Sequence, residues 1–95
     1  MNVKNENLWN KFIDGKAAVR IETKDQYDSF IEICDKNDLL WINGDKPKSF
    51  DVWSKREPDL CIFLMQDKEM CQASLTDCLR WKLSVVKFED LIIFI

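Results

Sequence analysis

Hydrophobic residues follow a helical period in two segments of the chain. In residues 24–36, core-facing side chains recur at the spacing i, i+3, i+4 and i+7; these are Tyr27, Phe30, Ile31 and Cys34. Thr23 and Gln26 have the spacing of a capping box, so we expect this helix to begin directly after Thr23. A shorter apolar stripe in residues 5–14, followed by Gly15, predicts an N-terminal helix.

Other segments have patterns that are typical of strands. Residues 16–22 and residues 84–88 alternate between an apolar and a more polar side, as a half-buried strand does. Residues 60–65 form a continuous apolar run, which favours a strand in the centre of a sheet.

Three further segments complete the chain. A short strand is expected at residues 39–42, before the turn-forming pair Asn43 and Gly44, and a short edge strand at residues 50–53. Residues 66–77 follow neither period and are assigned to no element. The pattern predicts an α+β fold, in which a small, mostly antiparallel sheet of four to five short strands carries the main helix (about 24–36) on one face.

Composition indicates one small domain that spans residues 1–95. Its 46% hydrophobic residues can form one core, and two glycines and two prolines leave no room for a flexible linker. A net charge of −3 disfavours direct binding to nucleic acid. The longest apolar run, LIIFI at residues 91–95, is too short to enter a membrane, and no secretion signal opens the chain. We therefore expect a cytoplasmic protein.

The inventory of reactive side chains argues against catalysis. The sequence has no histidine, so the usual general base and the usual partner of a nucleophilic serine or cysteine are missing. Four cysteines are widely spaced without a CxxC pair, which disfavours zinc, and because no secretion signal is seen we expect them to be free thiols in a reducing compartment; they are Cys34, Cys61, Cys71 and Cys78. We predict a protein that is not an enzyme and that has no metal and no cofactor.

Acidic residues form a row along the main helix. Asp25, Asp28, Glu32 and Asp35 cluster within about 80° on a helical wheel, away from the apolar stripe. The sequence shows no matching row of bases, and Asp28 and Glu32 are like charges at i, i+4, which weakens the helix by a few tenths of a kcal/mol. Two interpretations stay open: an ordinary solvated helix face, or a surface that docks on basic residues of a partner.

The four tryptophans are expected mainly in the interior of so small a domain. Trp53 stands beside Lys55 and Arg56 in a polar context, so we expect it to be the exposed one and to act as a binding anchor. The predicted partner-binding residues are Asp25, Asp28, Glu32, Asp35 and Trp53.

The segment from Gly15 to Pro47 resembles small uncharacterised proteins of phages and prophages of low-GC Gram-positive bacteria. The positions that carry the resemblance are Gly15, Lys16, Val19, Thr23, Phe30, Cys34, Trp41 and Gly44, with Val85, Val86, Phe88 and Asp90 near the end. Members often have a histidine in the first strand, where this chain has Arg20. The resemblance implies an accessory protein, a class that includes anti-CRISPR proteins and other counter-defence factors, which act by binding.

The leading hypothesis is a phage or prophage protein that binds and inhibits or modifies a host protein, such as a CRISPR effector or another defence nuclease, through its acidic surface. One alternative is a sponge for a signalling nucleotide, held between subunits by basic residues; the candidates are Arg20, Lys46, Lys48, Arg56 and Arg80. Another is a self-assembling structural module whose LIIFI segment adds a strand to a neighbouring copy. The sequence leaves open whether the chain is a monomer or a homodimer.

Overall fold

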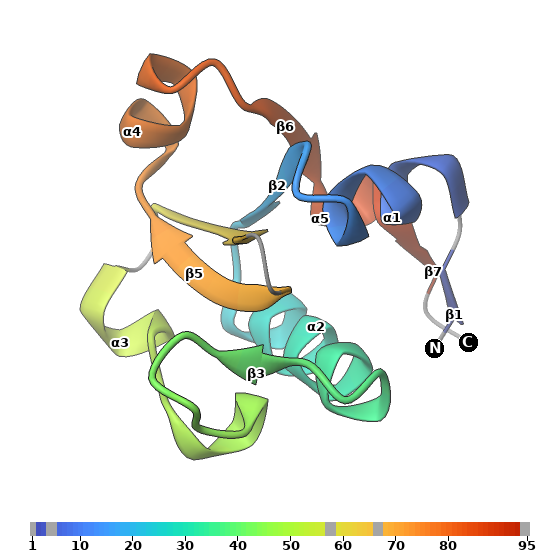
Figure 1. The fold of residues 1–95 in the computed structure, drawn as a ribbon, viewed down its shortest axis with the longest axis vertical. Helices are drawn as coiled ribbons and strands as arrows, with labels where there is room; N and C mark the ends of the chain where they lie inside the picture. The colour runs from blue at the N-terminus through green and yellow to red at the C-terminus, as the bar shows by residue number, and fades with distance from the viewer. Residues whose placement is uncertain (1, 4–5, 57–58, 66–67, 94–95) are drawn as a thin grey trace.

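A five-stranded sheet is the centre of the molecule (Figure 1). The computed structural model describes residues 2–3, 6–56, 59–65 and 68–93. The strands of this sheet are β2 (Ala17–Ile21), β3 (Leu40–Trp41), β4 (Leu60–Leu64), β5 (Glu69–Ala73) and β6 (Ser84–Lys87). The helices are α1 (Glu6–Ile13), α2 (Lys24–Lys36), α3 (Trp53–Arg56), α4 (Leu75–Arg80), α5 (Phe88–Leu91) and the 3-10 turn η1 (Pro47–Ser49).

The order of strands in the sheet is β3-β5-β4-β2-β6, so β4 is central, as its continuous apolar run predicts. β4 is antiparallel to β2 and β5, whereas the edge strands β6 and β3 are parallel to their neighbours. Near the chain ends, β1 (Asn2–Val3) pairs antiparallel with β7 (Ile92–Ile93). The α+β class, the N-terminal helix and the helix packed on the sheet are confirmed.

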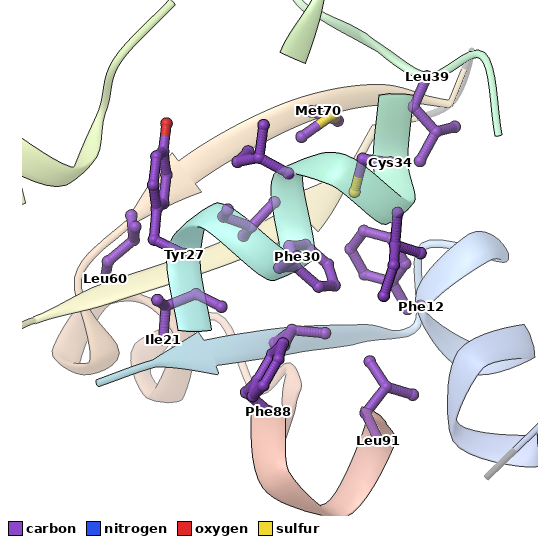
Figure 2. Packing of buried hydrophobic residues seen from close by; sticks show 14 of the residues in the cluster. Phe12, Ile21, Tyr27, Phe30, Cys34, Leu39, Leu60, Met70, Phe88 and Leu91 are labelled. Carbon is purple, nitrogen blue, oxygen red and sulfur yellow. The ribbon is translucent and has the colours of Figure 1, made fainter. Parts of the chain in front are cut away.

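The main core lies between α2 and one face of the sheet (Figure 2). Phe30 of α2 is fully buried and its ring meets the ring of Phe12 of α1 edge to face, with centroids 5.3 Å apart. Phe88 and Leu91 of α5 close the same core from below in this view. Each large side chain contributes about 2 kcal/mol on burial, so this cluster supplies most of the apolar stabilisation.

Local signals set both ends of α2. The Thr23 side chain accepts a hydrogen bond from the Gln26 backbone N–H at 3.2 Å, and Gln26 Oε1 accepts one from the Glu22 N–H at 2.8 Å. These bonds satisfy backbone donors that the first turn leaves unpaired. At the other end, Asn37 Nδ2 donates to the carbonyl of Ile33 at 2.8 Å.

The opposite face of the sheet is covered in part by α4. A second cluster, built of Ala18, Cys61, Ala73 and Cys78, is buried there. The strand β2 is therefore buried on both faces, and not half-buried as its alternation predicts. β5 and α4 together account for most of residues 66–77, the segment to which the sequence pattern assigns no element.

The edge strand expected at residues 50–53 is wrong. Asp51 Oδ1 accepts a hydrogen bond from the Trp53 N–H at 3.0 Å, and its Oδ2 accepts one from Ser54 Oγ at 2.7 Å. An aspartate that binds the backbone two residues ahead starts a turn, and here the turn leads into α3.

Candidate functional site

A groove of about 490 Å³ runs along α2, between this helix and residues 47–51. Its wall combines charged side chains with apolar ones; the lining residues are Lys24, Tyr27, Asp28, Ile31, Glu32, Pro47, Lys48 and Asp51. The helix and the following segment thus form one surface, which the helical wheel alone does not show.

Tyr27 holds the two sides of the groove together. Its hydroxyl donates to the carbonyl of Phe50 at 3.3 Å and accepts from the N–H of Val52 at 3.2 Å. Desolvation of the buried ring raises the pKa of Tyr27, so the hydroxyl keeps its proton and both bonds at neutral pH. The ring of Trp53 lies 6.2 Å from that of Tyr27, between centroids, which supports it from the side.

Three carboxylates border the groove: Asp28 and Glu32 from α2, and Asp51 from the segment before α3. The hydrogen bond from Ser54 lowers the pKa of Asp51, because it stabilises the charged form. Asp51 is therefore a fixed negative charge opposite the two acids of the helix.

The acidic row has bases beside it, so the expected lack of a balancing row is wrong. Lys24 Nζ lies 2.6 Å from Asp28 Oδ1, and Lys36 Nζ lies 3.8 Å from Glu32 Oε1. Both pairs have the i, i+4 spacing, which brings a lysine one turn away onto the same side of the helix. The hydrogen bond to Asp28 raises the pKa of Lys24. These pairs offset the repulsion between Asp28 and Glu32.

The other predicted site residues lie apart. Asp35 lines a neighbouring hollow of about 300 Å³ that also contains Lys46 and Pro47, and Asp25 is exposed in the first turn of α2. Trp53 is only 7% exposed, so its expected exposure is wrong: the turn at Asp51 directs its ring onto Tyr27. The sequence interpretation missed Tyr27 and Asp51 as parts of this surface. The spacing of Asp51 and Ser54 is typical of a turn and could have revealed the role of Asp51.

Trp81 is the exposed tryptophan, at 54% of its surface. It follows α4 directly, and its ring meets that of Phe63 with centroids 5.9 Å apart. It lies on the sheet face that carries α4, far from the groove on α2.

The basic residues considered for phosphate recognition do not converge within one chain. Arg20 Nη1 lies 3.5 Å from Asp59 Oδ1, and Arg80 Nη1 lies 3.8 Å from Asp77 Oδ1, so two of the arginines face acids of their own. Lys46 and Lys48 stand at η1, beside the acidic side of α2. The Arg56 side chain lies outside the described residues.

All four cysteines are free thiols, as expected. In the described ranges, no group of three or more histidine, cysteine, aspartate or glutamate side chains is arranged to hold a metal ion. Among the described helices, none has the length and apolar character needed to cross a membrane.

Comparison of the chain with protein-family models, with curated proteins and with solved structures finds no match in any of the three. The groove must therefore be interpreted from its own chemistry.

Proposed function

We propose that this chain is a binding protein that docks the groove along α2 on a basic segment of a partner protein and acts without catalysis. The supporting observation is the convergence of Asp28 and Glu32, from α2, and Asp51, from the segment before α3, on one groove. Tyr27 and Ile31 give this groove an apolar base. An arginine or lysine side chain has an apolar stem and a cationic head, so it matches both parts.

The charges of the groove favour a cation. Three carboxylates stand against Lys24 and Lys48, which leaves a net charge of −1 (two minus three). The pair between Lys24 and Asp28 is exposed, and exposed pairs contribute little, about 0 to 1 kcal/mol. An arginine of the partner, which binds a carboxylate through two parallel hydrogen bonds, can therefore displace Lys24 at low cost.

The partner that we propose is a host protein that handles nucleic acid, such as a CRISPR effector or another defence nuclease. The resemblance to phage and prophage accessory proteins supports this choice. Proteins that handle nucleic acid carry grooves rich in arginine and lysine, which bind phosphate groups. An acidic surface that docks in such a groove competes with nucleic acid. The chain would then act as an inhibitor by occupying phosphate contacts.

Charge reversal in the groove tests the proposal. The variant Asp28→Lys/Glu32→Lys is compared with Glu89→Lys/Asp90→Lys, which makes the same change of net charge at two exposed acids of α5. Isothermal titration of an arginine-rich peptide measures the affinity of each, and circular dichroism checks the fold. We expect the groove variant to bind at least about tenfold more weakly and the α5 variant to bind like the parent chain.

Salt provides a second readout. Because the contacts are exposed charges, raising ionic strength from roughly 0.05 to 0.3 M should weaken the parent chain's binding about tenfold. Equal losses in the groove variant and the α5 variant would indicate attraction by net charge alone, and the proposed site would be wrong. Equal affinity of the parent chain for an uncharged peptide of the same length would also contradict it.

A further inference from the structure

Two of the four cysteines meet in the small cluster between α4 and the sheet. Cys61 lies on β4, and because its neighbours Leu60 and Ile62 belong to the main core, alternation directs Cys61 to the opposite face. Cys78 is the buried residue of α4, which packs on that face. A hydrogen bond joins the two thiol groups. Strand and helix thus bring together two sulfur atoms that are 17 positions apart in the chain (78 minus 61).

The neighbours of these thiols are small. The other buried members of the cluster are Ala18 and Ala73, and Ala73 is the partner of Cys61 in the strand register. A disulfide needs Cβ atoms that lie about 4 Å apart, so it forms only between backbones that approach each other closely. Alanine side chains on either side allow α4 to make this approach to β4.

The other two cysteines have no such partner. Cys34 is buried in the main core, on the far side of the sheet, where burial raises the pKa of its thiol. Cys71 lies on β5, and its Sγ atom is 4.0 Å from the carbonyl oxygen of Glu69. Among the described residues, Cys61 and Cys78 are therefore the pair whose thiols are in contact.

Arg20 places a positive charge beside this pair. It is the register partner of Cys61 on β2, so both residues belong to the same sheet face. Burial raises the pKa of the Cys61 thiol to about 12, and the Arg20 guanidinium acts in the opposite direction. The Nη1 atom of Arg20 is buried and makes no hydrogen bond to any described residue, although Asp59 Oδ1 lies 3.5 Å away. Buried donors in proteins almost always have an acceptor, so this N–H is available to stabilise a negatively charged sulfur.

We propose that Cys61 and Cys78 are a redox pair, which hydrogen peroxide oxidises to a reversible disulfide. Cys61 reacts first, because Arg20 stays beside it on the sheet when α4 opens, and Cys78 returns with the helix to close the bond. The helix α4 has six residues and lies at the periphery of the molecule (Figure 1), so its opening leaves the main core folded. The pair stays reduced in a reducing compartment until the oxidant arrives.

Both chemical steps balance. The Cys61 thiolate attacks one oxygen of the peroxide, the O–O bond breaks, and the leaving hydroxide takes up the proton that the thiol had released, which gives a sulfenic acid and one water. The Cys78 thiol attacks the sulfenic sulfur, the S–O bond breaks, and the hydroxyl leaves as water with the proton of this thiol. Two thiols thus lose two electrons to one peroxide. Dithiothreitol returns both electrons by thiol–disulfide exchange.

The disulfide would fix α4 on β4. The backbone N–H groups of Cys78 and Trp81, which donate to the carbonyls of Ser74 and Asp77, exchange with solvent when α4 opens. Their hydrogen exchange should slow at least about tenfold in the oxidised chain, because the crosslink prevents this opening. The groove along α2 lies on the other side of the sheet, so its occupation does not enter this chemistry.

Peroxide treatment of the reduced chain, followed by mass spectrometry, tests the proposal. Digestion before Asp59, Asp67 and Asp77 places Cys61, Cys71 and Cys78 in three separate peptides. We expect a loss of about 2 Da, for two hydrogen atoms, and one link between the Cys61 peptide and the Cys78 peptide. Dithiothreitol should remove this link completely.

Variants identify the residues that take part. Cys61→Ala and Cys78→Ala should each abolish the link, whereas Cys71→Ala, the matched control, should form it at the parent rate. Arg20→Gln should slow its formation about threefold or more at neutral pH and less at pH 10, where a thiol that becomes exposed ionises unaided, and Arg20→Lys should restore the rate. Circular dichroism checks the fold of each variant.

Three results would overturn the proposal. The first is a disulfide that includes Cys71, and the second is a link between two copies of the chain. The third is oxidation of Cys71 to a sulfinic acid while Cys61 and Cys78 remain thiols. None of these results depends on whether the groove along α2 binds an arginine-rich peptide.

Discussion

At the scale of single residues, Tyr27 matters most for the shape of the groove. It is the only tyrosine in the sequence, and its hydroxyl joins α2 to the backbone at Phe50 and Val52. These two bonds help to fix the position of Asp51 relative to Asp28 and Glu32.

We expect Tyr27→Phe to lower the free energy of unfolding by about 1 to 3 kcal/mol, because the buried N–H of Val52 loses its acceptor.

The same residue makes stability depend on pH. Since folding raises the pKa of Tyr27, the folded chain keeps a proton that the unfolded chain has lost above about pH 10. Stability should therefore fall as pH rises above that value, and Tyr27→Phe should lack this component. Ultraviolet absorbance of the single tyrosine during a pH titration measures the midpoint of phenol ionisation, once in the folded chain and once in the chain unfolded by urea. Equal midpoints in the two states would contradict the prediction.

The tryptophans show the limit of local pattern at this scale. Lys55 and Arg56 make the neighbourhood of Trp53 polar, and yet Trp53 is buried because the Asp51 turn directs it onto Tyr27, 26 positions earlier in the chain. Trp81 follows α4 directly and remains exposed, with the ring of Phe63 as its aromatic neighbour. Exposure depends on distant neighbours, which a stretch of sequence does not contain.

At the scale of elements, Gly15 links α1 to β2. It has a φ of +75°, and the Lys16 N–H donates to the carbonyl of Lys11 at 2.8 Å, which closes the helix end. A Cβ at Gly15 would lie 3.0 Å from the backbone oxygen of Leu64, a distance that requires a shift of β4. Gly44 also has a positive φ, +90°, but a Cβ there meets nothing within 4 Å.

The two glycines form a matched pair for a prediction. Gly44→Ala adds only the backbone penalty of an alanine in the left-handed region, about 1 kcal/mol. Gly15→Ala adds the same penalty and the contact with Leu64, so we expect about 2 to 4 kcal/mol in all. Urea unfolding of both variants measures the difference. Equal destabilisation would show that the approach of β4 to Gly15 does not constrain the fold.

The elements that the sequence predicts well are those with local signals. α2 begins and ends where its period and the Thr23 cap predict, since both act within a few residues. β5 has no such signal: Glu69–Ala73 mixes polar and apolar residues, and it is a strand because β4 and β3 pair with its two edges. The parallel pairing of β2 with β6 joins residues that lie about two thirds of the chain apart, so no local pattern records it.

At the scale of the whole molecule, one sheet separates two cores of unequal strength. The core under α2 contains large side chains such as Phe30, Trp41 and Phe88, whereas the cluster under α4 is built of alanine and cysteine. α4 has only six residues, so few contacts hold it on the sheet. A region with less buried apolar area opens at a lower free energy than the whole molecule.

The cysteines can report this difference, because one or more lie in each layer. Cys34 is buried in the main core, Cys61 of β4 and Cys78 of α4 are buried between this helix and the sheet, and Cys71 of β5 is partly exposed. Burial raises the pKa of Cys61 to about 12, so its thiol reacts only after α4 opens and restores an ordinary pKa. We expect thiol labelling in dilute solution, followed by peptide mass spectrometry, to modify Cys71 first, Cys78 and Cys61 next at similar rates, and Cys34 last.

The variant Ser74→Ala tests whether α4 opens by itself. It removes the side chain that accepts a hydrogen bond from the Asp77 N–H at 3.1 Å, and a lost helix cap costs about 1 kcal/mol. Labelling of Cys78 and Cys61 should therefore become about fivefold faster. Cys34 should respond less. Identical acceleration of all three buried thiols would mean that both cores open only together.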